Sequence, residues 1–233
     1  MARSDAYTQK AVSPVKLYAS WSSNDKAFKF YDKEKGQDEL LKLPLKLVHL
    51  DEMATIKGFH DESNSSLYSN EVRSTVNEVL NVRSFKTGEI VSGIYSEIKS
   101  KIQSAGGKYN KSIYFFHNGD IINLSLQGAA LQAWAEFTKD AKKNKSLLDN
   151  YILIDAAADM KKGSIKYSIP VFKIGSTIAK EDAKSSDASY DTLNAYFADR
   201  YKDVKDEQPA PEQKTQSQNV DITEQVEEDL LPF

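Results

Sequence analysis

The last seven residues of the chain combine three kinds of side chain that bind other molecules in different ways. Acids come first, two leucines follow, and a Pro-Phe pair ends the run: Glu227, Glu228, Asp229, Leu230, Leu231, Pro232 and Phe233. A buried phenylalanine ring contributes about 1.5–3 kcal/mol, while its terminal carboxylate and the acids can pair with cations around an apolar socket. We therefore expect these residues to bind a partner protein.

Aromatic and basic residues alternate along several runs whose pattern predicts β-strands. Lys57 and Phe59 are two residues apart and so share one face of a strand, as do Arg83 and Phe85. Single-stranded nucleic acids bind to such surfaces, because bases stack on aromatic rings and phosphates pair with cations. The candidate nucleic-acid-binding residues are Lys16, Tyr18, Trp21, Lys26, Phe28, Lys57, Phe59, Tyr68, Arg73, Arg83, Phe85, Lys86, Tyr109 and Lys111. A ring such as Phe28 fits a place in the core equally well.

Residues suited to catalysis are few and scattered. His49, His60 and His117 lie far apart in the sequence, and none has a serine or acid at a spacing typical of a nucleophilic site. The acids between Asp51 and Glu62 can ligate a hard metal ion, but solvated turn residues explain them better. We therefore expect no catalytic residue, no metal and no cofactor. The alternative is a metal-dependent nuclease or other nucleic-acid hydrolase that uses these carboxylates.

The composition excludes several classes of protein. The 233 residues contain no cysteine, which excludes disulfides and thiolate metal sites. No apolar run has the length of a membrane span and the first residues lack a signal-peptide core, so we expect a cytoplasmic protein that does not enter a membrane. The charge is unevenly divided: residues 206–233 hold eight acids and one base, a net −7, whereas residues 1–205 hold 26 acids and 30 bases, a net +4.

Hydrophobic periodicity divides the chain into short strands and a few helices. Alternating apolar residues predict strands at 15–21, 26–31, 43–50, 53–60, 79–86, 109–117, 121–126, 151–156 and 164–174. Apolar residues at helical spacing predict helices at 90–102, 129–143 and 187–202. Residues 61–75 are polar and predict a surface loop.

These elements indicate a mainly β protein with inserted helices (α+β). An OB-type barrel fits them best, because that small barrel accepts helical insertions and keeps one binding face open. We expect a flexible N-terminus at 1–13, the barrel domain at 14–202, and a disordered acidic tail at 203–233 that contains several prolines and glutamines.

The tail resembles the acidic tip of single-stranded DNA-binding proteins, in which a run of acids ends in an aliphatic residue, proline and phenylalanine. Leu230-Leu231 stands here in place of the single aliphatic residue of that pattern. Residues 50–59 and 67–73 resemble the larger bacteriophage-type members of the family, with an outline that extends over residues 14–175. The resemblance implies an OB fold with extra helices, sequence-tolerant binding of single-stranded DNA, and recruitment of replication or recombination proteins in a bacterial host cell.

The acidic tail should compete with DNA phosphates for the basic body of the protein. The expected flexible linker keeps the acids at a high local concentration beside that body. Deletion of residues 206–233 should therefore strengthen binding to oligo-dT, most clearly at low salt, where screening is weakest. Fluorescence titrations over a salt series measure this effect. Equal affinities of the intact and shortened proteins at low salt would contradict the competition.

Overall fold

The structure is a computed structural model that describes residues 12–143 and 146–205. The expected acidic tail and its tip, Glu227 to Phe233, lie outside the described residues, as does most of the expected N-terminal segment. The described chain is mainly β with helices between the strands, as predicted. None of these helices is long and apolar enough to cross a membrane.

Eleven strands and four helices make up the described chain. The strands are β1 (Val15–Ser22), β2 (Ala27–Asp32), β3 (Gln37–Leu41), β4 (Leu45–His60), β5 (Ser65–Ser69), β6 (Leu80–Ser84), β7 (Gly88–Gly93), β8 (Gly107–His117), β9 (Asp120–Gln127), β10 (Asn150–Lys162) and β11 (Ile165–Thr177). The helices are α1 (Tyr95–Ser104), α2 (Gly128–Lys143), α3 (Ser146–Asp149) and α4 (Lys180–Lys205).

All the described strands belong to one mixed sheet. Its order is β3-β2-β1-β9-β8-β4-β5-β6-β7, and β4 also carries the β10–β11 hairpin as a branch. β1 and β9 run parallel, while the other neighbours are antiparallel. The order begins at β3 and ends at β7, so the sheet is open and does not close into the predicted barrel. Ser168 of β11 forms two hydrogen bonds with Ser23 in the β1–β2 turn and accepts a third from Trp21 Nε1 of β1.

β4 is one continuous strand where the sequence predicts two. The charged pair Asp51 and Glu52 suggests a break between two strands, but in the structure basic side chains neutralise both acids. Arg73 Nη2 lies 2.6 Å from Asp51 Oδ2. Lys111 Nζ lies 3.2 Å from Glu52 Oε1. The register against β8 shifts between His49 and Asp51, and the strand continues through this irregularity for 16 residues in all.

Some residues that the sequence predicts to be loop or helix form paired strands in the structure. β5 lies within the predicted loop 61–75, and β7 includes the start of the predicted helix 90–102, so that α1 begins only at Tyr95. β3 is not predicted, and α4 begins at Lys180 instead of 187. β6 supplies backbone partners to both β5 and β7, and this pairing outweighs the local helical or polar pattern.

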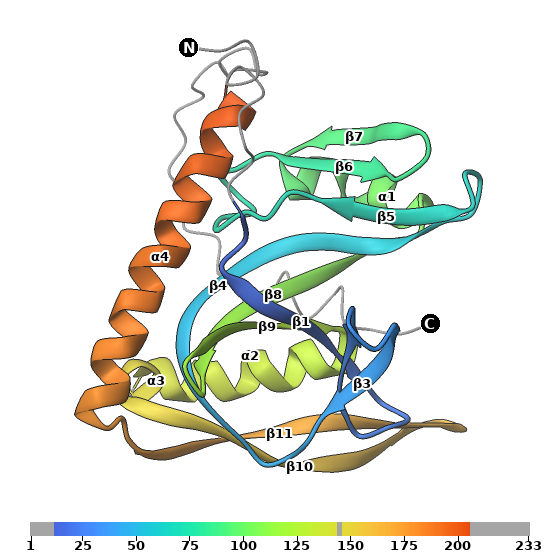
Figure 1. The fold of residues 1–233 in the computed structure, drawn as a ribbon. Coiled ribbons are helices and arrows are strands. Elements are labelled where there is room, and N and C mark those ends of the chain that lie inside the picture. The colour runs from blue at the N-terminus through green and yellow to red at the C-terminus, as the bar shows by residue number, and fades with distance from the viewer. Residues whose placement is uncertain (1–11, 144–145, 206–233) are drawn as a thin grey trace, which may run out of the picture.

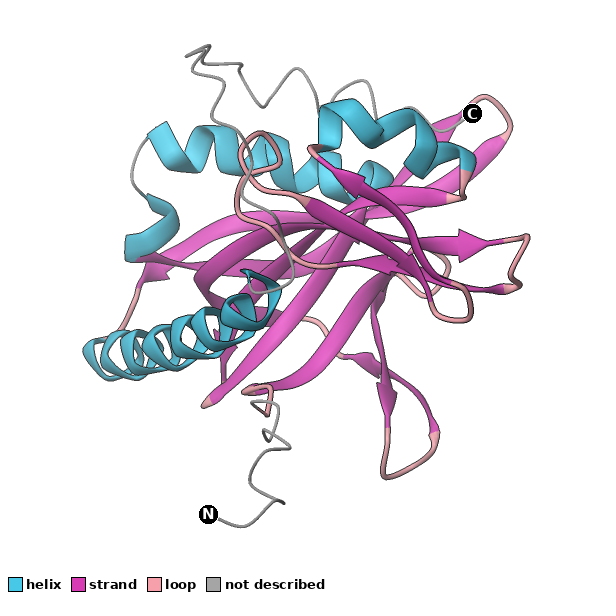
Figure 2. Cartoon of the chain, turned by 90° about the horizontal axis from the view of Figure 1, so that it is seen from above, coloured by secondary structure: helices cyan, strands magenta, loops and turns pink. Residues whose placement is uncertain are grey.

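Helices pack on both sides of the strands, as Figures 1 and 2 show. α2 lies between β8–β9 and the β10–β11 hairpin, where Trp134 packs against Phe115 and Phe172 at ring-centroid distances of 5.8 and 5.1 Å. α4 covers another part of the sheet through Leu193 and Phe197. α1 packs with β4, β6 and β7 in a third apolar cluster.

Gly58 separates Lys57 from Phe59 at the point where β4 meets the end of α1. A Cβ atom on Gly58 would collide with the carbonyl oxygen of Gly106. A Cβ atom on Gly106, which has a φ of +81°, would collide with the carbonyl oxygen of Phe59. Only glycine allows the two backbones to approach so closely, and this approach fixes the path of β4 beside Lys57 and Phe59.

Phe28 and Phe85 give a matched test of which rings belong to the core. Phe28 is 0% exposed and Phe85 is 78% exposed. Phe28→Ala should lower the free energy of unfolding by about 3–5 kcal/mol, because it removes buried apolar area and leaves a cavity. Phe85→Ala should change that free energy by less than about 0.5 kcal/mol. Urea denaturation measures both variants, and similar losses for the two would contradict the assignment.

Candidate nucleic-acid interface

One side of β4, β5 and β6 carries a row of polar and aromatic side chains. Strand pairing places Lys57 opposite Tyr68, and Tyr68 opposite Arg83. Their neighbours Ile56 and Val82 point the other way and join the apolar cluster that includes α1. The strand pleat therefore separates the row from the core.

A second row follows on the same side. Phe59 lies opposite Ser66, and the backbone N–H of Phe85 donates to the carbonyl oxygen of Ser66 at 3.0 Å. This pairing brings the two phenylalanines, which are far apart in the sequence, to the same edge of the surface. We call the surface the aromatic–basic face; its members are Lys57, Phe59, Tyr68, Arg83 and Phe85.

The rings of the aromatic–basic face are open to solvent. Phe59 is 49% exposed, Tyr68 is 45% exposed, and Phe85 is the most exposed of the three. Arg83 is exposed beside them. Burial of apolar surface contributes about 25 cal/mol of free energy per Å², and rings that stay in water do not make this contribution. A group of exposed rings is therefore typical of a binding surface.

Lys57 connects the aromatic–basic face to buried polar groups on β8 and β9. Its Nζ donates to Ser125 Oγ at 2.7 Å, and Ser125 Oγ donates to Asn110 Oδ1 at 2.7 Å. Leu124 and Leu126 alternate with Ser125 and pack in the cluster around α2. The same pleat thus sends apolar side chains toward α2 and polar side chains toward Lys57.

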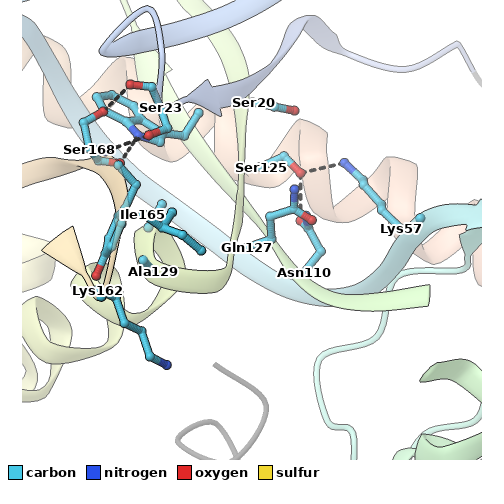
Figure 3. Close-up of a pocket in the computed structure, with 15 residues that line it drawn as sticks. Ser20, Ser23, Lys57, Asn110, Ser125, Gln127, Ala129, Lys162, Ile165 and Ser168 are labelled. Atoms are coloured by element: carbon cyan, nitrogen blue, oxygen red, sulfur yellow. Dashed lines mark hydrogen bonds between the residues drawn. The ribbon is translucent and has the colours of Figure 1, made fainter. Parts of the chain in front are cut away.

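These polar groups form one wall of a cleft of about 670 Å³. Figure 3 shows Lys57 and Asn110 pointing toward Ser125 on one side, with Ile165 of the β10–β11 hairpin on the other. The β1–β2 region contributes the remaining wall. The volume lies within the range of small-molecule sites, about 300–1,000 Å³.

Lys57 holds its charge in a partly buried place. Burial lowers the pKa of its ammonium group, and the carboxylate of Glu71 opposes this shift. Glu71 is engaged elsewhere, because the Tyr114 hydroxyl donates to its carboxylate at 2.7 and 2.8 Å from the two oxygens. No carboxylate of the described residues lies within ion-pair distance of Lys57, whose Nζ hydrogen-bonds a neutral hydroxyl. The cleft wall therefore favours an anion.

No family model, curated protein or solved structure matches the chain. Its function is therefore inferred from the side chains that the fold brings together. The positions of the predicted site residues decide which of them can act on one ligand.

Three predicted rings do not belong to the aromatic–basic face. Phe28 is fully buried, so the prediction that it can serve as a stacking ring is wrong. Trp21 packs edge-on against Phe28 at 5.1 Å and lines the cleft. Tyr109 is half-buried against Tyr95, with ring centroids 5.3 Å apart, and contacts two apolar clusters. Tyr109 points to the core because it alternates with Asn110, which faces the cleft.

Tyr18 is 50% exposed on β1, beyond the two rows described above. Its hydroxyl lies 2.7 Å from Ser13 Oγ. Burial of the hydroxyl end raises the pKa of Tyr18, and the hydrogen bond to Ser13 opposes this change. The structure therefore leaves Tyr18 accessible but does not bring it into contact with the predicted rings of β4, β5 and β6.

The predicted cations are divided in the same way as the rings. Lys57 and Arg83 lie on the aromatic–basic face, whereas the others bind groups elsewhere: Lys16 pairs with Asp120, Lys26 with Asp159, Arg73 with Asp51, Lys111 with Glu52, and Lys86 donates to Asn64 O. Lys111 is the clearest correction, because it shares the Glu52 carboxylate with Lys142 of α2, on the side of the sheet that faces the core. Exposed pairs such as that of Lys16 contribute only about 0–1 kcal/mol.

Sequence reasoning missed the polar wall of the cleft. Asn110, Ser125 and Gln127 line it, and the exposed Lys108 lies opposite Lys57 in the pairing of β4 with β8. The available signal is the alternation of apolar and polar residues along β9, which predicts a strand with one buried and one polar face. The kind of ligand that this polar face can bind depends on Lys57, which is 68 positions away from Ser125 in the sequence.

The acids of the alternative metal site do not come together. Asp51 and Glu52 each pair with a basic side chain near the middle of β4. Asp61 and Glu62 follow the far end of that strand. Across residues 12–143 and 146–205, no three His, Asp or Glu side chains form a group that can hold a metal ion.

His49 is buried close to Glu52 and stacks on Trp134, with ring centroids 6.0 Å apart. Neither ring nitrogen has a hydrogen-bond partner among the described residues. Burial lowers the pKa of His49, against the opposing effect of Glu52. Burial by itself raises the pKa of Glu52, but Lys111, Lys142 and the Trp134 N–H outweigh it and lower that pKa to about 2. His49 is therefore neutral near pH 7 while Glu52 is charged.

The stability of the protein should fall as the pH drops below about 6.5, the ordinary pKa of histidine. The lowered pKa means that the folded protein binds a proton at His49 more weakly than the unfolded chain does, so acid favours unfolding. Between pH 7.5 and 5.5 the free energy of unfolding should fall, and this one group can account for at most about 1.4 kcal/mol of the fall. Urea denaturation at several pH values measures the change.

His49→Phe keeps a ring on Trp134 and removes the titrating group, so it should flatten this pH dependence. His117→Gln is the control, because the ring of His117 already hydrogen-bonds the carbonyl oxygen of Lys46 at 3.0 Å. An unchanged slope in His49→Phe would show that another group is responsible.

Proposed function

We propose that the protein binds single-stranded DNA along the aromatic–basic face. The observation that carries this proposal is the convergence of three exposed rings with Lys57 and Arg83 on neighbouring strands. Rings can stack on unpaired bases, whose faces a duplex hides, and the two cations can pair with the phosphates between them. Because every base has a π-face, binding of this kind tolerates many sequences.

The arrangement of the strands supports an OB-type interpretation of the fold. β4 pairs with β8 along most of its length, with β10 at its start and with β5 at its end. Because β4 is shared among these neighbours, the sheet bends around α2, as Figure 1 shows. OB-type domains bind single strands across an open, curved face, and the aromatic–basic face together with the cleft offers such a surface.

The proposed function includes the tail as a second binding element. Its acids and its Leu-Leu-Pro-Phe tip would recruit replication or recombination proteins once DNA occupies the basic body. This part of the proposal is supported by the sequence alone, including the resemblance to bacteriophage-type single-stranded DNA-binding proteins that act in a bacterial cytoplasm. The protein would then protect exposed strands without cutting them.

The nuclease alternative has weaker support. A two-metal or one-metal hydrolase needs carboxylates gathered around the ion, and Asp51 and Glu52 are instead neutralised by arginine and lysine side chains. Incubation of end-labelled single-stranded DNA with Mg²⁺ and Mn²⁺ separates the two functions. Retention of full-length DNA supports a binding protein, and metal-dependent loss of the label supports the nuclease.

A titration of oligo-dT, duplex of equal length and oligo-U tests the proposed function directly. Single strands should bind much more tightly than duplex, and the affinity should fall as salt rises, because bound cations release counterions from the phosphates. The comparison with RNA establishes whether the sugar matters. Equal affinity for the single-stranded and duplex DNA would refute stacking on the aromatic–basic face.

Tyr68→Ala should weaken oligo-dT binding, because the loss of one stacked base removes about 1–3 kcal/mol, or roughly 5- to 150-fold in affinity. Tyr190→Ala is the matched control: Tyr190 is 42% exposed on α4, close to the value for Tyr68, but lies outside the face. Fluorescence anisotropy measures both affinities, and thermal melting confirms that both variants fold. Equal losses in the two variants would remove Tyr68 from the interface.

A further inference from the structure

Hydrogen bonds link Lys57, Ser125 and Asn110 into a chain along the cleft. An ammonium group can only donate, so Ser125 Oγ must accept from Lys57 Nζ. Ser125 Oγ donates its proton to Asn110 Oδ1 at 2.7 Å. Asn110 Oδ1 therefore faces Ser125, and the Asn110 amide nitrogen has no hydrogen bond to a described residue.

At Lys57 and Asn110 this wall of the cleft presents hydrogen-bond donors, with the neutral side chain of Gln127 beside them. Lys57 Nζ has two further protons, and the Asn110 amide nitrogen has two more. Such a wall binds oxygen atoms that accept hydrogen bonds, above all anionic oxygens, since Lys57 lacks an ion-pair partner among the described residues.

The opposite wall carries apolar side chains beside Lys162 at the end of β10, and hydrogen bonds hold it in place. Trp21 Nε1 donates to the Ser168 carbonyl oxygen at 2.9 Å, which fixes the indole ring between β1 and β11. Ser168 is held in turn by the Ser23 hydroxyl and carbonyl, at 2.6 and 2.7 Å. Ile165 and Tyr167 of β11 extend this wall toward the hairpin tip.

We propose that the cleft binds one nucleotide of the DNA strand, with its phosphate on Lys57 and Asn110 and its base against Trp21 and Ile165. This inference rests on the proposed function and adds a defined subsite to it. The donors of Lys57 and Asn110 on one wall and the Trp21 and Ile165 side chains on the other suit a ligand that is anionic at one end and flat and weakly polar at the other, as a nucleotide is. Lys57 also belongs to the aromatic–basic face, so a strand stacked on Tyr68 can continue into the cleft without a break in its phosphate contacts.

Thymidine 5′-monophosphate is the probe for this subsite, because it is too short to span the aromatic–basic face. Its binding to the full chain is followed by NMR shifts of amide signals and by calorimetry. The nucleotide should bind in the millimolar range, thymidine without phosphate at least about tenfold more weakly, and the shifts should centre on residues of β9 and the β10–β11 tip. Thymidine that binds as well as its monophosphate would overturn the placement of the phosphate on Lys57.

Lys57→Met and Lys108→Met form a matched pair for the same experiment. The two lysines lie opposite each other on β4 and β8, but only Lys57 lines the cleft. Lys57→Met should weaken thymidine monophosphate binding by about tenfold or more, and Lys108→Met by less than about twofold. Asn110→Asp, which replaces the donor by a carboxylate next to Lys57, should weaken it as well. Equal effects of the two lysine variants would refute the subsite.

Oligo-dT titrations of the same variants separate this inference from the proposed function. Failure of thymidine monophosphate to bind, while oligo-dT binds and Tyr68→Ala weakens it, would overturn the subsite alone. We expect both Tyr68→Ala and Asn110→Asp to lose affinity for oligo-dT. Of the two, only Asn110→Asp should lose binding of the monophosphate. Absence of oligo-dT binding to the unaltered protein would refute the proposed function, whatever the mononucleotide does.

Discussion

The pleat of β4 places one set of its side chains in the core and the other on the proposed binding surface. Successive residues of a strand must point to opposite sides of the sheet. Ala54 and Ile56 enter the apolar cluster that includes α1, and this requirement sends Lys57 and Phe59 to the other side. A shift of one residue would exchange the two sets, so burial of the apolar side fixes the register and with it the composition of the exposed side.

Ion pairs in the middle of β4 connect this strand to its surroundings. Arg73 binds Asp51 and also donates to Asn194 of α4 at 2.8 Å, while Glu52 receives hydrogen bonds from Trp134 and Lys142 of α2. Removal of one partner from such a group leaves an uncompensated, partly buried charge, which is strongly destabilising. The acids that interrupt the apolar pattern of the sequence therefore hold β4 against the two longest helices.

The proposed binding surface combines two physical modes that meet at Lys57. On the aromatic–basic face, exposed rings offer stacking, which is tolerant of base identity. In the cleft, fixed donors and a held indole ring offer directional contacts to one ligand group. A strand that uses both would be held firmly at one nucleotide and loosely along its neighbours. Burial of Lys57 strengthens its attraction for a phosphate, because the surrounding medium screens charge less than water does.

Periodicity along the chain is enough to predict the β8–β9 hairpin, α2, and the shared faces of Lys57 with Phe59 and of Arg83 with Phe85. Which of these faces are covered depends on how the strands and helices pack together. Phe28 and Phe85 occur in similar local patterns, yet Phe28 is buried by the cluster around α2 and Phe85 remains in water. The reason is that alternation defines two faces of a strand, whereas burial depends on contacts with residues far away in the sequence. The link from Lys57 to Ser125, which creates the cleft wall, is a contact of that kind.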